Sequence, residues 1–210
     1  MPDTLRLAAE AARGFMPAEE GLALYQTAAE YASVGPIAEI GTYCGKSTIY
    51  LAAAASAAGQ LVVTVDHHRG SEEIQPGWEH HDPDLVDPAT GQMDSLPFFR
   101  AALAATGLER HVVAVIGSSA DVSRLWRTQL GMLFIDGGHS EASVVTDYEG
   151  WAPWVAVGGA LAFHDIFPDP SDGGQAPYRV YQRARACGAF EEVSVTGSLR
   201  VLRRTGHGIG

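Results

Sequence analysis

Carboxylates and imidazoles follow three short apolar segments of the chain, in the stretches VDHH, FIDGGH and AFHDIF. Each stretch comes directly after a segment that we expect to be a buried strand, so its polar residues mark a strand end. The ends of adjacent parallel strands meet at one edge of a sheet, which is where ligands bind in α/β proteins. Carboxylate oxygens suit Mg²⁺, and imidazoles also admit Mn²⁺ or another transition metal. The pattern therefore indicates a polar site that could hold a divalent ion.

The glycine-rich stretch GTYCGKST admits two interpretations. A phosphate-binding loop requires the pattern G-x-x-x-x-G-K, and the spacing from Gly41 to Gly45 is one residue too short for it. Glu39, just before the loop, would also repel phosphates. A P-loop-like nucleotide hydrolase, with Lys46 on the phosphates and Asp136 ending a Walker B-like strand, is the alternative. We favour a different loop with a different cofactor.

The segment QLVVTVD ends on Asp66, which lies 21 residues after Gly45. An acid at about this distance from a glycine turn accepts hydrogen bonds from ribose hydroxyls in nucleotide-binding sheets. The G-x-G-x-x-G fingerprint of dinucleotide-binding proteins is missing, which favours a mononucleoside such as S-adenosylmethionine. The simpler alternatives are that Asp66 is a surface acid and that Ser119, in IGSSAD, only caps a helix.

Strand patterns and helix patterns alternate along the chain, and two closing strands share a short turn. This order predicts an α/β fold with a doubly wound, mostly parallel, seven-stranded Rossmann-like sheet. Helices should cover both faces, and the C-terminus should form an antiparallel hairpin. We expect one domain over residues 1–210, with two N-terminal helices in 1–34 and an insert at 67–94. Strands are expected at 36–41, 60–66, 111–117, 131–136, 158–165, 190–195 and 198–204, and further helices at 46–58, 95–107, 119–127, 140–155 and 178–188.

Composition excludes several classes of function. The 210 residues, 46% of them hydrophobic, suffice for one α/β domain. A formal net charge of -11 argues against nucleic acid or an anionic membrane as partner. Two cysteines imply no disulfide framework, and the N-terminal segment is typical of an amphipathic helix rather than a signal peptide. We expect a cytoplasmic protein whose N-terminal helices cover the pocket or form a homodimer.

The stretch AEIGTYCGKSTIYLA resembles the cofactor loop of class I S-adenosylmethionine-dependent methyltransferases, specifically of the catechol O-methyltransferase branch. That branch carries an E-x-G-x-Y-C-G-x-S run at this place, and the similarity continues in order from about residue 36 to 166. The resemblance puts the methionine part near the glycine loop and its carboxylate on a serine. It puts the ribose on the strand-end acid and the adenine near the serine of IGSSAD. The implied cofactor-binding residues are Glu39, Gly41, Tyr43, Gly45, Ser47, Asp66, Ser119 and Asp136.

The same resemblance implies a metal site and a base. In that branch an acid after the fourth strand and two residues after the fifth hold the metal, and these correspond to Asp136, His164 and Asp165. His164 departs from the usual carboxylate, so we expect Mg²⁺ with Mn²⁺ as the alternative. His139 stands where the catechol enzymes have a lysine base, and an imidazole with a pKa near ~6.5 suits proton removal at neutral pH. Macrocin-type sugar O-methyltransferases, which the sequence resembles through IDGGHS, share this histidine.

The insert 67–94 shows no helix or strand period, which is typical of an active-site lid. Trp78 could stack on a sugar, and His80 and His81 could donate hydrogen bonds to hydroxyls; otherwise Trp78 only fills an apolar gap. The stretch DHHRGSEEIQPGWEHHDP is similar to that of the 1-O-methyltransferases of methylmannose polysaccharide assembly. That similarity implies a short, partly methylated mannoside as the acceptor.

Two other classes of function fit the same residues. An Fe(II) oxygenase could use the histidine and the two acids at the strand ends, and a non-catalytic partner protein could simply bind the nucleoside. Iron-dependent oxygen consumption would indicate the first, and a lack of turnover with the right acceptor the second. From the sequence we predict metal-assisted methylation of a sugar or polyol hydroxyl.

Overall fold

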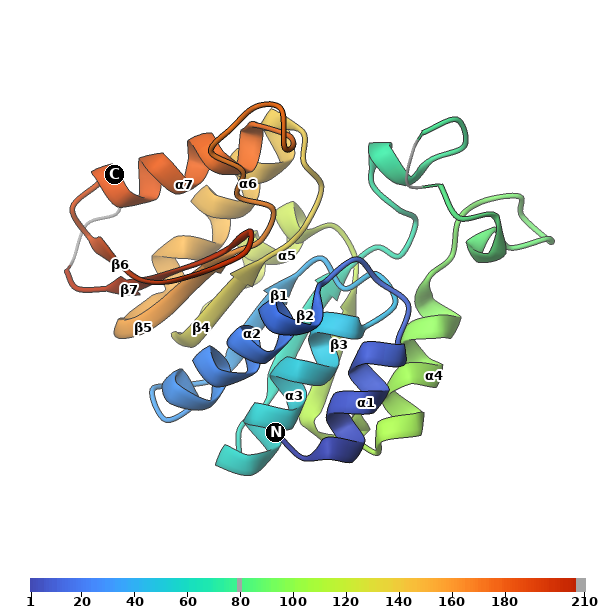
Figure 1. Ribbon diagram of the computed structural model, residues 1–210, viewed down its shortest axis with the longest axis horizontal. Helices are drawn as coiled ribbons and strands as arrows, with labels where there is room; N and C mark the ends of the chain where they lie inside the picture. Colours follow the sequence, from blue (N-terminus) through green and yellow to red (C-terminus); the bar gives the residue numbers. More distant parts are fainter. Residues whose placement is uncertain (79–80, 207–210) are drawn as a thin grey trace.

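A computed structural model describes residues 1–78 and 81–206 (Figure 1). Seven strands form one sheet in the order β3-β2-β1-β4-β5-β7-β6. The number of strands, the mostly parallel pairing and the antiparallel C-terminal hairpin are as the sequence predicted. The strands are β1 (Ile37–Ile40), β2 (Val62–Asp66), β3 (Val112–Ile116), β4 (Leu130–Ile135), β5 (Val155–Phe163), β6 (Phe190–Thr196) and β7 (Leu199–Arg204). The helices are α1 (Asp3–Ala11), α2 (Ala18–Tyr31), α3 (Lys46–Ala58), α4 (Leu96–Thr106), α5 (Ser119–Leu125), α6 (Glu141–Trp151) and α7 (Ala176–Ala186).

Strands β1 and β4 form the buried centre of the sheet. Every residue of both strands is buried, because helices cover both faces of a central parallel pair. The register aligns Ile40 with Val65 of β2 and Ile135 of β4, so the strand ends lie at nearly the same level. The polar residues predicted at these ends therefore lie at one edge of the sheet.

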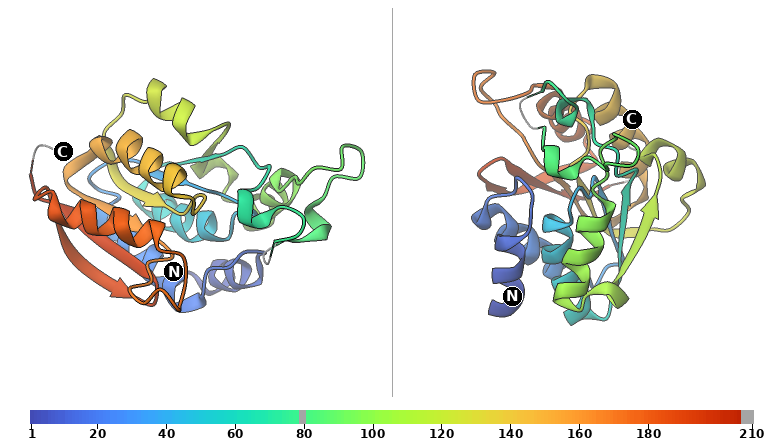
Figure 2. Two further views of the ribbon diagram at one scale, coloured as in Figure 1. Left: turned by 90° about the horizontal axis from the view of Figure 1, so that it is seen from above. Right: turned by 90° about the vertical axis from the view of Figure 1, so that its right-hand side faces the viewer.

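Helices α1 to α4 cover one face of the sheet, and α5 to α7 cover the other (Figure 2). The first face is filled by side chains such as Leu24 and Tyr50, and the second by Tyr148 and Trp151. Burying a large apolar side chain stabilises the fold by roughly 1.5–3 kcal/mol. The apolar residues of α1 and α2 belong to the first of these cores, so both helices are part of the domain.

The C-terminal hairpin places β7 between β5 and β6, antiparallel to both. Its turn contains Gly197 at φ 53, a left-handed conformation that favours glycine. A Cβ there would lie 2.0 Å from Oε1 of Glu20 in α2. Ser198 donates to Glu20 through its backbone N–H at 2.7 Å and its hydroxyl at 3.0 Å. The hairpin turn is thus bound to the N-terminal part of the chain.

Element ends around β5 differ from the prediction. The expected helix 140–155 ends at Trp151, because Pro153 lacks an N–H and residues 152–154 form a 3-10 turn. Strand β5 then begins at Val155, ahead of the glycine pair expected to start it. Gly158, at φ 85, lies within the strand, where the pairing with β4 shifts register.

The insert 67–94 projects beside α4, in teal to green in Figure 1. It contains the 3-10 helices η1 (Glu72–Ile74) and η2 (Pro83–Leu85). Its Leu85 and Met93 form a small apolar cluster with Cys44 of the glycine loop. The insert is therefore packed onto the cofactor loop that the sequence predicted. Among the residues with assigned positions, no helix has the length and apolarity needed to cross a bilayer.

Candidate active site

A cavity of about 1010 Å³ lies at the carboxyl ends of the strands. Its volume reaches the top of the range for ligand pockets, roughly 300–1,000 Å³, so it has room for a nucleoside and a second ligand. It gathers residues from the ends of β1 to β5, as the sequence predicted. Nine of the predicted site residues line it: Gly41, Tyr43, Ser47, Asp66, Ser119, Asp136, His139, His164 and Asp165.

The glycine loop after β1 is shaped by its neighbours. Gly41 has φ 91, and a Cβ there would lie 2.1 Å from the carbonyl oxygen of Asp136. The backbone N–H groups of Thr42 and Tyr43 both donate to Oδ2 of Asp66, each at 2.9 Å. A carboxylate has about four lone-pair sites, so Asp66 can still accept from a ribose hydroxyl. Its role toward the cofactor stays a prediction, and the structure adds a role in holding the loop.

Glu39 lies beneath this loop and is fully buried. It accepts hydrogen bonds from the hydroxyls of Ser47, Thr48 and Thr64, each at 2.6 Å. Burial raises the pKa of Glu39 to about 7, although the three hydroxyls oppose this shift. Neither Glu39 nor Gly45 is among the residues that line the cavity. This corrects their expected position: both support the loop from behind.

His139 lies between two carboxylates. Its Nε2 is 3.0 Å from Oδ2 of Asp165, and its Nδ1 is 3.3 Å from Oε1 of Glu73 in the insert. Burial lowers the pKa of the ring, but the hydrogen bond to Asp165 and the nearby acids outweigh it, so the pKa of His139 is raised. The position predicted for the base is therefore both accessible, at 37% side-chain exposure, and surrounded by negative charge.

Asp165 combines strain with strong electrostatic support. Its φ of 56 is left-handed, a conformation that costs free energy and clusters at functional sites. Burial alone would raise its pKa, but the hydrogen bonds from His139 and His164 lower it far below its usual range. The carboxylate is therefore ionised and held in a fixed direction.

His164 is buried and also lies between acids. Its Nδ1 is 3.2 Å from Oδ1 of Asp136 and 3.4 Å from Oδ2 of Asp165, and its Nε2 is 2.6 Å from Oε2 of Glu20. Burial lowers the pKa of His164, but the charge of Asp136 and the hydrogen bonds raise it far more. Sequence reasoning missed Glu20, because two adjacent acids in the first turn of a helix are ordinary there.

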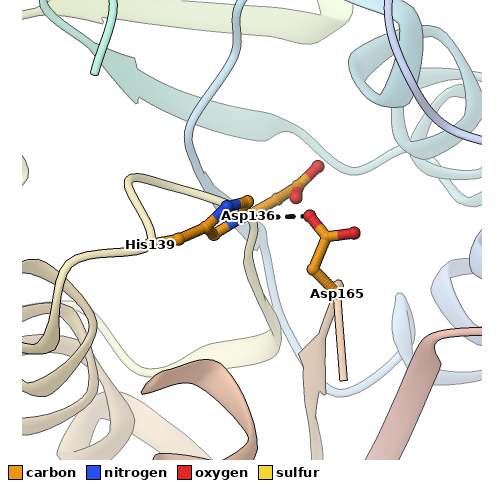
Figure 3. A group of neighbouring side chains, drawn as sticks. All are labelled: Asp136, His139 and Asp165. Atoms are coloured by element: carbon orange, nitrogen blue, oxygen red, sulfur yellow. Dashed lines mark ion pairs between the residues drawn. The ribbon is translucent and has the colours of Figure 1, made fainter. Parts of the chain in front are cut away.

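Asp136, His139 and Asp165 each offer one ligand atom, and these atoms lie within 4.8 Å of one another (Figure 3). Two carboxylates and one imidazole suit Mn²⁺ or Mg²⁺ supplemented by water, so the residues fit a divalent ion. The structure thus brings together the two predicted acids but groups them with His139.

The predicted ligand His164 has a different environment. With Glu20 beside Nε2, Nδ1 is the ring atom that faces Asp136 and Asp165. A carboxylate that accepts from the second ring nitrogen is the usual partner of a metal-binding histidine. The metal role of His164 therefore stays a prediction, with Glu20 as its orienting partner.

Ser119 begins α5 and lines the cavity. Its hydroxyl donates to Asp147 of α6, and its carbonyl accepts from Nε1 of Trp151 at 3.2 Å. Burial raises the pKa of Asp147 to about 6. Sequence reasoning missed Asp147, since it lies in the middle of a helix with no motif around it. The N-cap position of α5 is occupied by Ser118, without a side-chain capping bond, so Ser119 does not have that role.

Two of the predicted substrate residues, Trp78 and His81, are not among the residues that line the cavity. Trp78 is 54% exposed, and Nδ1 of His81 is 3.1 Å from the carbonyl oxygen of Ile74. His80 lies outside the described residues. The aromatic residues that line the cavity instead include Phe15 and Tyr43, whose ring centroids are 5.5 Å apart, and Phe167. The structure therefore does not bring the insert's aromatic residue to the site.

The chain matches known proteins over most of its length. Residues 38–166 match a family model described as a methyltransferase domain. The O-methyltransferase NovP is 17% identical, with 90% of this chain and 81% of that chain covered and a TM-score of 0.69. The O-methyltransferase TomG from Streptomyces achromogenes, solved with S-adenosylmethionine, is 18% identical, with 98% and 91% covered and a TM-score of 0.66.

A third structure is the methyltransferase PaMTH1 from Podospora anserina, solved with S-adenosylhomocysteine. It is 16% identical, with 98% of this chain and 89% of that chain covered and a TM-score of 0.66. At these identities the solved structures show a common fold, and the family model covers more than half of the chain. The chain therefore belongs to the methyltransferase-domain family, on its Rossmann-like scaffold.

Proposed function

We propose that this protein transfers a methyl group from S-adenosylmethionine to a hydroxyl of a sugar or polyol, assisted by a divalent metal. The observation that carries the proposal is the convergence of two groups of residues on one cavity. The glycine loop with Asp66 forms one side, and Asp136, His139 and Asp165 form the other. This arrangement supports a nucleoside subsite beside a base and a cation subsite.

The cofactor side of the cavity has the features that a sulfonium nucleoside needs. The strand-end acids Asp66 and Asp165 line this region, and their negative charge suits a positively charged cofactor and disfavours a triphosphate. TomG and PaMTH1 were solved with the substrate and the product forms of this cofactor. When bound, S-adenosylmethionine would supply an electrophilic methyl group and leave as S-adenosylhomocysteine.

The acceptor side supplies proton transfer and charge stabilisation. A divalent ion held by Asp136 and Asp165 would favour the ionised form of an acceptor hydroxyl. His139 would accept the proton of that hydroxyl, and Asp165, whose Oδ2 is 3.0 Å from the ring, would stabilise the resulting imidazolium. Proton removal by a positioned base contributes roughly 10²–10⁴-fold to a rate.

A hydroxylated acceptor fits the cavity better than a flat phenol. The lining around His139 consists of small or polar residues, including Gly138, Ser140 and Ser143. Phe15 and Tyr43 offer a ring face at one side, on which the apolar face of a sugar can stack. The resemblance of the insert supports a partly methylated mannoside, methylated at its reducing-end hydroxyl.

Calorimetry and an acceptor screen test the proposal. We expect S-adenosylmethionine and S-adenosylhomocysteine to bind, and ATP not to bind. With methyl-labelled cofactor, label should pass to mannosides in the presence of Mg²⁺ or Mn²⁺, and a chelator should abolish transfer until metal is restored. Binding of ATP alone would support a nucleotide hydrolase, and iron-dependent oxygen consumption an oxygenase; either result would overturn the proposal.

A further inference from the structure

We propose that Phe167, in the connector between β5 and α7, binds the acceptor. Its ring is the surface on which the apolar face of a sugar ring stacks. The sequence predicted that role for Trp78, which does not line the cavity, whereas Phe167 does. The class of acceptor comes from the proposed function, on which this assignment rests.

Phe167 lies at the end of the cavity that the nucleoside does not use. The cavity residues predicted for the nucleoside follow β1, β2 and β3, whereas the ion-binding group follows β4 and β5, the next strands in the sheet order. Phe167 comes two residues after Asp165, at the last strand in that order that contributes to the cavity. A ligand beside Phe167 therefore lies across the ion-binding group from the nucleoside, where an acceptor has to be.

The side chains after β5 alternate between the cavity and the core. Asp165 and Phe167 line the cavity, and Ile166 between them is buried in the second core. The backbone N–H of Ile166 donates to the carbonyl oxygen of Ser198 in the hairpin turn at 3.1 Å. This part of the connector is thus held against the hairpin, on the opposite side of the strand ends from the insert (Figures 1 and 2).

The rest of the connector is shaped around the ring of Phe167. A Cβ on Gly173 would lie 2.3 Å from Cδ2 of that ring, so a methyl group there would displace it. The side-chain amide of Gln175 donates to the backbone carbonyl oxygens of Phe167 at 3.0 Å and of Gly173 at 3.1 Å. The ring therefore has its place before a ligand arrives, which lowers the ordering cost of binding.

The surroundings of the ring suit a hydroxylated ligand. A sugar ring presents a face of C–H bonds and an edge of hydroxyls, so it needs an apolar surface together with a few hydrogen-bonding groups. Asp172, in the same connector, and Ser143, in α6, line the cavity and supply such groups. The other ring pair, Phe15 and Tyr43, lies at the glycine loop and so borders the nucleoside.

A binding measurement without turnover tests the role of the ring. Saturation-transfer NMR on protein loaded with S-adenosylhomocysteine and Mg²⁺ gives the Kd of mannobiose. Phe167→Ala should raise this Kd at least about fivefold, because the apolar face of the sugar then meets water. Phe167→Tyr keeps the ring and should stay within about twofold of the wild type. Calorimetry should give one Kd for S-adenosylhomocysteine in all variants, which shows that the fold and the cofactor subsite are intact.

Two adjacent glycines of the connector provide a matched pair of variants. Gly173→Ala should weaken mannobiose binding as Phe167→Ala does, since the added Cβ displaces the ring. Gly174→Ala makes the same change at a position where no heavy atom of the described residues lies within 4 Å of the new Cβ, and it should bind like the wild type. Neither glycine has a left-handed φ, so backbone strain does not distinguish the two variants.

Kinetics assign the effect to the acceptor. In Phe167→Ala the acceptor KM should rise by the same factor as the Kd, and kcat should stay within about threefold, because the ring touches no reacting atom. Wild-type affinity in Phe167→Ala, equal affinities in the two glycine variants, or a wild type that does not bind mannobiose would overturn the inference. If the wild type bound mannobiose through Phe167 but transferred no methyl group, the proposed function alone would fail.

Discussion

The two histidines of the site have similar partners but different access. Each lies between acidic side chains, yet the side chain of His139 is 37% exposed and that of His164 only 5%. Both rings line the cavity, but the more exposed one is easier for a ligand to reach. We therefore expect proton transfer at His139, and we expect His164 to support the strand-end acids.

Replacing the exposed imidazole should separate binding from turnover. We expect His139→Ala to lower kcat by roughly 10²–10⁴-fold, because the acceptor proton loses its base. The cofactor Kd should not change, since the glycine loop and Asp66 are left in place. Calorimetry and initial rates measure the two quantities, and a variant with wild-type turnover would remove His139 from the mechanism.

Replacing Asp66, the acid that ends β2, should instead weaken cofactor binding. Asp66→Ala leaves the N–H groups of Thr42 and Tyr43 without their acceptor, so the loop loses its shape as well as a ribose partner. Hydrogen bonds to a charged group are worth about 1.5–3 kcal/mol each, so the cofactor Kd should rise at least about tenfold. Asp121→Ala, at an exposed acid on α5, is the control. Equal dissociation constants in the two variants would contradict the role of Asp66.

The strand-end and loop residues of the site were predictable, whereas Glu20 and Glu73 were not. Asp66, Asp136 and Asp165 follow apolar strand patterns, and parallel strands bring such positions together whatever the rest of the chain does. Glu20 and Glu73 come from a helix and an irregular insert, where acids are common on the surface. Their burial against histidines depends on tertiary packing, which local sequence patterns do not encode.

At the scale of elements, β1, its loop and α3 form a unit around Glu39. Three hydroxyls from two elements donate to this one carboxyl group, which has no exposed surface. The sequence predicted the strand, the turn and the helix, because apolar pattern and glycine are local signals. It predicted Glu39 at the cofactor, but the side chain points away from the cavity. The direction of that side chain follows from the register of β1 with β2 and β4, which the sequence does not show.

The raised pKa of Glu39 makes stability depend on pH. Burial raises that pKa from 4.5 to about 7, so between these values the folded protein keeps a proton that the unfolded chain releases. The contribution of Glu39 to the free energy of unfolding should therefore fall as pH rises through this window, by about 3 kcal/mol, and level off above pH 7. Glu39→Gln lacks this titration.

Urea denaturation of the wild type and Glu39→Gln at pH 5 and pH 8 measures the effect. Other groups titrate in both proteins, so the difference between the two isolates Glu39. The variant should gain stability relative to the wild type at pH 8 by about 3 kcal/mol more than at pH 5. A difference that stays constant across the window would show that the buried carboxyl does not titrate there.

At the scale of the whole molecule, the site is closed by parts of the chain that lie far apart in sequence. Helix α2, the C-terminal hairpin and β5 meet at Glu20, which binds both Ser198 and His164. The connector after α1 meets the insert through Arg13 and Asp82. The predicted layers are confirmed. These long-range contacts were not predictable, because the local sequence pattern of one segment does not indicate which distant segment it will pack against.

Trp151 joins α6 to α5 in the second core. Trp151 has no exposed surface, its ring centroid is 5.2 Å from that of Trp126, and its Nε1 donates to the carbonyl of Ser119. Trp151→Ala should lower the free energy of unfolding by about 3–5 kcal/mol, since it opens a cavity and leaves that carbonyl without its donor. Trp78→Ala removes the same side chain from the insert, where it is 54% exposed, and should change stability by less than about 0.5 kcal/mol. Urea denaturation compares the two, and similar losses would show that the second core does not carry the fold.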